Sequence, residues 1–185
     1  MNKSFFLDPV QILIGPKASV QKDAALILDG CIEAFGKEAR KKAEKLNIKK
    51  ESAPHQLLAP PLVDCHSILE EPINDRHENI KSLINSACNS GYGQIGLLPR
   101  SKESRDTPEK LMIISNLSSD IKIHLWANFS KAGKGEELSA HADLIKHGAI
   151  GLSDDDSLIN LSLINKGLNL GEIGDSPILL APRDK

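Results

Sequence analysis

The sequence predicts an α/β fold in which a small N-terminal β module precedes a partial (β/α) barrel of the TIM type, with about four and a half βα units. Two observations predict this fold. After residue 55, apolar segments bounded by glycine or proline alternate with helix-prone segments, as in parallel strands joined by helical crossovers. A closed eightfold barrel takes about 250 residues, so the roughly 130 residues that follow the β module can supply about half of one.

Residues 1–55 are expected to form a small β-sandwich-like module. Residues 5–14 alternate weakly between apolar and polar side chains, which favours a strand that ends at Gly15-Pro16. Residues 24–36 hold two short apolar runs joined by Asp29-Gly30, a dipeptide typical of the tight turn of a β-hairpin. A hairpin is therefore predicted after the first strand.

Residues 37–50 form a charged, basic and helix-prone segment. A basic helix can bind a membrane surface or nucleic acid when it carries a broad apolar face. Here the apolar face is limited to Ala39, Ala43 and Leu46. We therefore expect a solvated helical excursion from the β module.

Residues 56–185 are expected to form the N-terminal half of the barrel, in which apolar strands alternate with helices. Thr107 is a helix-capping residue, and Pro108 suits the first position of the helix that follows it. The expected strands are residues 57–63, 94–98, 122–127, 149–152 and 177–180. The expected helices are residues 79–90, 108–116 and 136–147, and a last one from Asp155 or Asp156 to about residue 170.

The composition argues against several classes of partner. A net charge of -2, a pI near 6.3 and an aromatic content of 3% are not typical of a nucleic-acid-binding surface. No apolar run approaches the roughly 20 residues that cross a bilayer, so no membrane association is expected. Cys31, Cys65 and Cys88 are odd in number and lie in apolar contexts. They favour reduced, buried thiols in a cytoplasmic protein over disulfides.

Polar residues follow three of the expected strands, at the ends where a βα barrel carries its reactive groups. Histidine and aspartate at such places can bind a metal and carry protons. The same residues also have structural interpretations, because a histidine can be a hydrogen-bonded core residue and an aspartate can cap the next helix. The three groups are Asp64-Cys65-His66 with Glu70-Glu71, Asp154-Asp155-Asp156, and Arg183-Asp184. On the third barrel strand, His124 is expected to be buried and hydrogen-bonded.

These motifs, taken in order, resemble the cyclic amidohydrolases, and most closely dihydroorotase. The first barrel strand of that family reads Ala-Pro-Gly, two apolar residues, then Asp-x-His-x-His-Leu-Arg-Glu-Pro. This chain agrees with it at Ala59, Pro60, Leu62, Val63, Asp64, His66, Leu69, Glu71 and Pro72. The resemblance extends over essentially the whole chain and includes the N-terminal β module.

Three further segments are similar to family motifs. Leu97-Leu98-Pro99-Arg100-Ser101 resembles Met-Pro-Asn-Thr after the second strand. Asp106-Thr107-Pro108-Glu109 resembles Asp-Asn-Pro-Glu, and Leu152-Ser153-Asp154-Asp155 resembles Phe-Thr-Asp-Asp after the fourth strand. Each motif alone is weakly specific, whereas their ordered set is strongly so.

The resemblance implies a zinc-dependent hydrolase that opens and closes the dihydroorotate ring in pyrimidine biosynthesis. One or two zinc ions would activate a water molecule and polarise the amide carbonyl. By position, His66 matches the first histidine ligand of the family. Asp155 best matches the aspartate that binds metal and handles the proton, with Asp154 as the other candidate.

This chain departs from the family at several site positions. Ile68 stands where the second histidine is expected, and Ala181 stands where the fifth-strand histidine is expected. Neither side chain can coordinate a metal. Glu70 replaces the arginine expected to bind the substrate carboxylate, so the charge is reversed and an anion would be repelled. Arg100 replaces an asparagine.

Three functional hypotheses follow. The chain could be a residual enzyme for a small cyclic amide, in which a partner chain supplies the missing strands and His66 with Asp155 binds one zinc ion. It could be a non-catalytic pseudoenzyme that serves as a scaffold for aspartate carbamoyltransferase, as some dihydroorotase-like proteins do. It could also be an inactive gene fragment, cut after the fifth barrel strand. A half barrel with open edges favours oligomerisation in each case.

Overall fold

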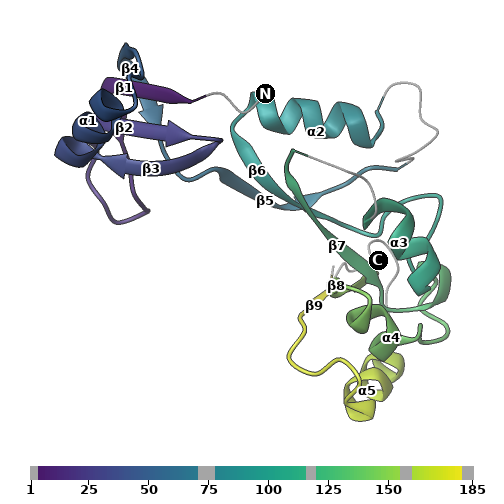
Figure 1. Cartoon of the computed structure of the whole chain (residues 1–185). Helices are drawn as coiled ribbons and strands as arrows, with labels where there is room; N and C mark the ends of the chain where they lie inside the picture. Colours follow the sequence, from purple (N-terminus) through teal and green to yellow (C-terminus); the bar gives the residue numbers. More distant parts are fainter. Residues whose placement is uncertain (1–3, 71–77, 116–119, 155–159, 181–185) are drawn as a thin grey trace. The chain divides into compact units, whose positions relative to one another are not determined.

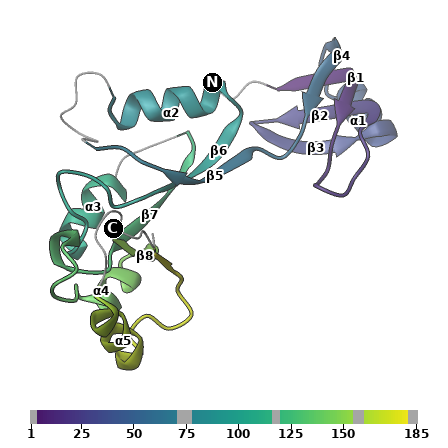
Figure 2. The same cartoon turned by 180° about the vertical axis from the view of Figure 1, so that it is seen from behind.

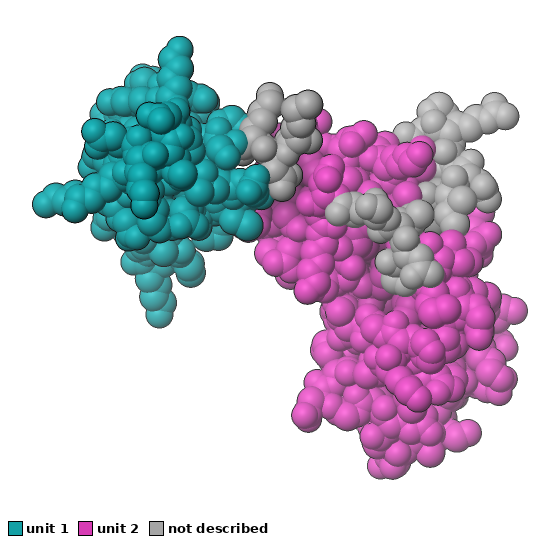
Figure 3. Space-filling view, viewed as in Figure 1, with its two compact units in different colours: residues 1–60 teal, residues 61–185 magenta. Residues whose placement is uncertain are grey.

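The computed structural model describes residues 4–70, 78–115, 120–154 and 160–180. The chain divides into two compact units, residues 1–60 and residues 61–185, which Figure 3 shows in two colours. In the described parts of both units, none of the helices is long and apolar enough to cross a membrane.

The first unit contains a four-stranded sheet in the order β3-β2-β1-β4. Its strands are β1 (Phe5–Ile12), β2 (Gln21–Leu28), β3 (Cys31–Phe35) and β4 (Lys50–Leu58). The strands β1, β2 and β3 are antiparallel, and β4 is parallel to β1. The hairpin predicted at Asp29-Gly30 is confirmed, because both residues have positive φ angles, 50° and 81°, as the tight turn requires.

Helix α1 (Gly36–Lys45) packs on this sheet, contrary to the solvated helix expected from the sequence. Ala39 and Ala43 are completely buried and form one core with Phe6, Leu26 and other side chains of the sheet. Because alanine is small, a narrow apolar face is sufficient when the helix lies close to the strands. Leu46, the third residue of the expected face, is exposed.

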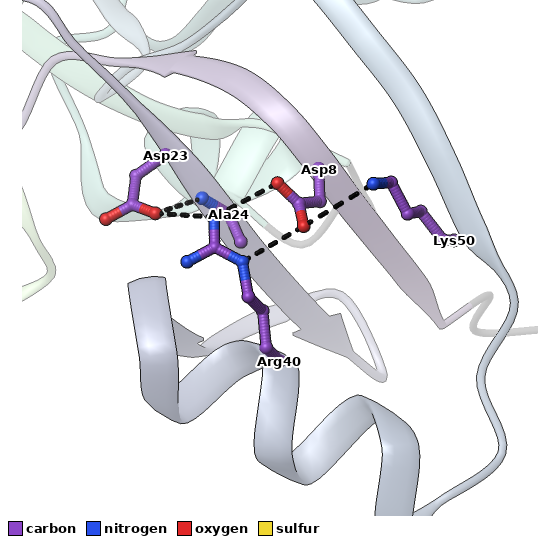
Figure 4. A network of polar contacts seen from close by, with 5 residues as sticks. All are labelled: Asp8, Asp23, Ala24, Arg40 and Lys50. Atoms are coloured by element: carbon purple, nitrogen blue, oxygen red, sulfur yellow. Dashed lines mark hydrogen bonds and ion pairs between the residues drawn. The ribbon is translucent and has the colours of Figure 1, made fainter.

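Ion pairs also fasten α1 to the strands beneath it (Figure 4). Arg40 Nε lies 3.0 Å from Asp8 Oδ2 of β1, and Arg40 Nη2 lies 2.9 Å from Asp23 Oδ1 of β2. Lys50 of β4 lies 3.7 Å from Asp8. The hydrogen bond from Arg40 is the main reason that the pKa of Asp8 is lowered, and the charges of Arg40 and Lys50 add to it against a smaller opposing effect of burial.

The second unit contains a five-stranded parallel sheet whose strands follow chain order, β5-β6-β7-β8-β9. These strands are β5 (Leu62–Ser67), β6 (Tyr92–Leu97), β7 (Lys122–Asn128), β8 (Ala149–Asp154) and β9 (Ile178–Leu180). Sequential order is what right-handed βα crossovers produce in a barrel. The predicted partial (β/α) barrel is therefore confirmed.

Helices alternate with these strands along the chain, and all but the last of them lie along the sheet (Figures 1 and 2). They are α2 (Ile80–Asn89), α3 (Pro108–Ser115), α4 (His141–Lys146) and α5 (Leu161–Leu170). Each of α2, α3 and α4 packs against the strand that follows it, β6, β7 and β8 respectively. The main core lies between these layers and includes Leu97, Leu125, Phe129, Leu144 and Leu152.

Some boundaries differ from those expected. Residues 136–140 precede α4 as bends and an isolated bridge, so the helix starts only at His141. Helix α5 starts at Leu161 with Asn160 as its N-cap, whereas the expected start at Asp155 or Asp156 lies outside the described residues. The three cysteines are exposed rather than buried.

The expected buried strand over residues 57–63 is divided between the two sheets. Its first residues end β4 in the first unit, and Leu62 and Val63 begin β5 in the second. Leu62 is 55% exposed and Val63 52% exposed. The expectation of burial was wrong because, in the described residues, β5 is an edge of the sheet, as β9 is at the other end of the strand order.

Candidate functional site

The candidate site lies at the carboxyl ends of strands β5 to β8, which together form one end of the parallel sheet, called the carboxyl edge below. At this edge β5 closes with Asp64-Cys65-His66-Ser67, and β7 is followed by Phe129 and Ser130. Strand β8 ends at Asp154, and the segment between β6 and α3 contains Arg105. Parallel strands bring their carboxyl ends together, so these segments are neighbours although they lie far apart in the sequence.

The end of β5 is irregular. Asp64 pairs with Ile95 and Ser67 pairs with Leu97, so three steps along β5 match two along β6. One extra residue is therefore accommodated at Cys65-His66, as in a β-bulge. Gly96 of β6 makes this possible, because a Cβ there would lie 2.8 Å from the carbonyl oxygen of Cys65.

Asp64 holds this bulge in place. Its Oδ1 accepts a hydrogen bond of 2.9 Å from the backbone N–H of His66, and its Oδ2 accepts one of 2.6 Å from Ser67 Oγ. These two hydrogen bonds, that of Ser67 first, lower the pKa of Asp64. Asp64 and Ser67 also line an opening of about 160 Å³ beside α2, together with Ser86 and Tyr92. Asp64 thus acts structurally on the chain around His66.

The metal ligands predicted from the sequence are only partly within the described residues. His66 is exposed at the end of β5, and so are Ile68 and Glu70 just after it. Asp155, Ala181, Glu71 and the segment 183–184 lie outside the described residues. Within the described ranges, no three His, Cys, Asp or Glu side chains come together as a metal site requires. The described residues alone therefore do not make up a zinc site.

Asp154, the alternative aspartate, is buried and joins β8 to the end of β7. Its two carboxylate oxygens lie 3.1 and 3.0 Å from the backbone nitrogen of Ser130, which donates to them, and the Ser130 hydroxyl donates to Oδ2. Ser130 Oγ in turn accepts a hydrogen bond of 2.7 Å from the backbone N–H of Gly135. The helix-cap interpretation is therefore wrong for Asp154, which braces two strand ends.

A second set of contacts binds the β6–α3 segment to β7. The backbone N–H of Arg105 donates to Asn128 Oδ1 at 2.6 Å, and the backbone N–H of Asn128 donates to the carbonyl oxygen of Arg105 at 2.9 Å. Next to it, Asp106 Oδ2 accepts a 2.8 Å hydrogen bond from the backbone of Ala132. Asp106 also pairs with Lys110, at 2.7 Å.

The pKa values of Arg105 and Asp106, which are adjacent in the chain, are lowered for different reasons. Burial acts to raise the pKa of Asp106, but the hydrogen bonds from Lys110, Ala132 and Ser104 together outweigh it and lower that pKa. The Arg105 side chain is only 2% exposed, and desolvation lowers its pKa to about 9. Sequence reasoning missed Arg105, since an arginine in a polar segment carries no signal of burial.

Two histidines of the second unit have structural roles. His141 is fully buried, with Nε2 2.7 Å from the carbonyl oxygen of Phe129 and its ring 4.7 Å from the Phe129 ring. His124 forms a 2.8 Å hydrogen bond with Gln94 and is half-buried, so its predicted hydrogen bonding is confirmed. Burial, followed by the charge of Lys122, lowers the pKa of His124.

Comparison with known proteins gives consistent likenesses, although no family model matches the chain. A probable dihydroorotase-like protein of Synechocystis is 25% identical over 150 residues, which are 68% of this chain and 34% of that protein. A dihydroorotase of Lactococcus lactis is 31% identical over 131 residues, 69% of this chain and 31% of the enzyme. The chain spans about a third of the length of these relatives.

A solved structure has the same fold. The L-hydantoinase (dihydropyrimidinase) of Arthrobacter aurescens superposes with a TM-score of 0.65 over 95% of this chain and 40% of the enzyme. The sequence identity is 12%, so this likeness supports the architecture alone. It includes both the β module and the βα units, because nearly all of the chain is covered.

Proposed function

Because this chain belongs to the cyclic amidohydrolase family and is related to the dihydroorotases, we propose that it is a dihydroorotase-like protein with an impaired hydrolytic site. The observation that carries the proposal is Ile68. It stands two residues after His66, where the family motif has its second histidine. An alkyl side chain cannot replace an imidazole as a zinc ligand.

The other candidate ligands do not compensate for Ile68. A catalytic zinc site needs three protein ligands and one open position. His66 offers one imidazole, and the carboxylate of Asp154 is already engaged by the backbone and hydroxyl of Ser130. Asp155 stays a proposed ligand and proton carrier, paired with His66. Without the second imidazole of the pair, zinc would be bound more weakly, so we infer that hydrolysis of the ring amide is slow or lost.

Charge at the same edge supports impairment for an anionic substrate. Dihydroorotate carries a carboxylate, and the family places an arginine beside the metal to bind it. Glu70 is exposed at the corresponding position of this chain, three residues after the end of β5. A carboxylate there repels another carboxylate, more strongly at low ionic strength. A neutral cyclic amide would escape this repulsion.

Zinc content and dihydroorotate hydrolysis of the purified chain test the proposal together. We expect less than one zinc per chain and no turnover above background. The matched variant Ile68→His restores the missing imidazole and should bind zinc more tightly than the wild-type chain, even if no turnover appears. Stoichiometric zinc and turnover in the wild type, both abolished by His66→Ala, would overturn the proposal.

A second candidate function, a scaffold for aspartate carbamoyltransferase, is favoured by the edge strand β5. Leu62 and Val63 are more than half exposed on it. An edge strand with exposed apolar side chains is a template for another polypeptide. In this proposal, aspartate carbamoyltransferase covers that edge, and the half barrel needs no catalytic residues.

The scaffold can be tested by co-purification of the full chain with aspartate carbamoyltransferase, followed by light scattering of the complex. Leu62→Lys with Val63→Lys should abolish the complex. Ile14→Lys replaces an even more exposed apolar residue of the first unit and should leave the complex intact. A homogeneous monomer that does not bind aspartate carbamoyltransferase would refute this function. Self-association through β5 would instead show that a second copy of the chain, not the carbamoyltransferase, covers this strand.

A further inference from the structure

Arg105 combines deep burial with unused hydrogen-bonding capacity. Its Nε and Nη1 atoms are buried and have no hydrogen-bond acceptor in the described part of the chain. It is the bulkiest of the fully buried side chains there. A guanidinium carries five N–H donors and, when buried, is normally paired with a carboxylate or several carbonyl oxygens. The unused N–H donors of Arg105 therefore suit a partner of opposite charge.

Three acidic or amide side chains at this end of the sheet are already engaged. The side-chain oxygen of Asn128 accepts from the backbone N–H of Arg105, not from its guanidinium. Asp106 accepts from Lys110 and from the backbone of Ala132. Asp154 accepts from Ser130. None of these three contacts neutralises Arg105, and a charge removed from water without a partner is strongly unfavourable.

The backbone of Arg105 is held from both sides. Its N–H and its carbonyl oxygen are both bonded to Asn128 at the end of β7, and Asp106 is tied to Ala132 one residue later. The segment is thus fixed at the carboxyl edge of the sheet, where βα proteins bind their ligands. A positive charge on a fixed backbone in a dry environment is the arrangement that favours tight binding of an anion.

We propose that Arg105 is the anchor of a small-carboxylate binding site at the carboxyl edge of β6 and β7, separate from His66. The planar guanidinium matches a carboxylate in shape and in donor geometry. Desolvation lowers the pKa of Arg105 to about 9, so the side chain keeps its positive charge at neutral pH. The site does not depend on zinc or on any hydrolytic activity of the chain.

Thermal unfolding of the full wild-type chain in low-salt buffer, titrated with acetate, tests this proposal. Sodium chloride and sodium phosphate at matched ionic strength are the parallel arms. We expect a saturable rise in the unfolding temperature with acetate that chloride does not produce. An equal response to all three salts, or no response, overturns the proposal. A response to phosphate alone overturns the carboxylate assignment.

Two variants separate a binding role from a structural one. Arg105→Met removes the charge but keeps much of the side-chain volume. It should unfold at the same or a higher temperature than the wild type without acetate, and it should not respond to acetate. Lys102→Gln removes an exposed charge from the same segment and should keep the full response.

The opposite pattern would identify an internal partner. If Arg105→Met is much less stable in every buffer while the wild type ignores acetate, Arg105 is paired within the protein and the proposal is wrong. If Arg105→Met does not fold, Arg105→Lys keeps the charge but loses the planar fork. It should then need at least about tenfold more acetate for the same shift.

Discussion

Asp154 at the end of β8 accepts hydrogen bonds from both the backbone N–H and the hydroxyl of Ser130, which follows β7. The two residues are 24 positions apart in the chain. Because the Asp154 carboxylate is buried, these bonds supply the polar contacts that water would otherwise provide. The aspartate that the family resemblance offers as an alternative metal ligand is therefore engaged in bracing the sheet edge.

This brace predicts that Ser130→Ala destabilises the protein. The variant loses the hydroxyl bond to Asp154 and leaves the backbone N–H of Gly135 without its acceptor. A lost hydrogen bond to a buried charged group costs about 1.5–3 kcal/mol of unfolding free energy. Urea unfolding followed by circular dichroism measures it. Ser86→Ala changes an exposed serine of α2 and should stay within about 0.5 kcal/mol. Equal effects of the two variants would contradict the brace.

The bulge at the end of β5 gives a second prediction. Gly96→Ala places a Cβ 2.8 Å from the carbonyl oxygen of Cys65, so the bulge or β6 must shift. Overpacking of this kind costs about 1–3 kcal/mol of unfolding free energy. The matched control is Gly15→Ala, whose new methyl group meets nothing within 4 Å. Denaturant unfolding compares the two, and a neutral Gly96→Ala would show that β5 does not approach β6 as described.

The ion pairs of α1 predict an acid-sensitive first unit. Arg40 lowers the pKa of Asp8 in the folded state. As the pH falls, the Asp8 carboxylate is therefore protonated in the unfolded state before it is protonated in the folded state. The stabilisation from Asp8 is therefore fully present above the carboxyl's unfolded pKa of about 3.9 and is lost as the pH falls through its lower folded value. Asp8→Asn should weaken the fall in stability on acidification, measured by unfolding temperature between neutral pH and pH 2 or so.

A control variant separates this effect from general charge loss. Glu51→Gln removes one negative charge from an exposed position on β4 of the same unit. It should leave the acid limb of the stability curve close to that of the wild type. If Asp8→Asn and Glu51→Gln give superimposable curves, the pairing of Asp8 with Arg40 does not contribute measurably in solution.

The elements that were predictable from the sequence depend on local chemistry. Asp29-Gly30 sets a hairpin by its own backbone preferences. Asn79 and Ser82 form a capping box that starts α2 where it was expected. The sequential parallel sheet follows from the alternation of strands and helices, because crossovers of one hand leave few other arrangements.

The elements that were missed depend on tertiary contacts. The apolar run around Pro60-Pro61 is continuous in sequence, yet β4 and β5 belong to different sheets. The burial of Arg105 depends on Asn128, 23 residues later, and no local pattern announces it. Composition likewise cannot reveal that alanines alone suffice to bury α1. In the candidate site, residue identities indicated the family and the replacement of its second histidine by Ile68. The bracing role of Asp154, in contrast, required the structure.

His141 supports a last prediction, because it is fully buried beside Phe129. Its ring is packed against Phe129 and bonded through Nε2 to the Phe129 carbonyl oxygen, and a Cβ on Gly167 of α5 would lie 3.3 Å from it. His141→Ala would leave a cavity and remove one of the hydrogen bonds to the Phe129 carbonyl oxygen, which also accepts from Ser139, at a cost of about 2–5 kcal/mol of unfolding free energy. His147→Ala, on an exposed residue just after the same helix, should cost less than about 1 kcal/mol. Chemical unfolding of both variants measures the difference. Similar losses would mean that the contacts of His141 with Phe129 do not stabilise the packing of α4.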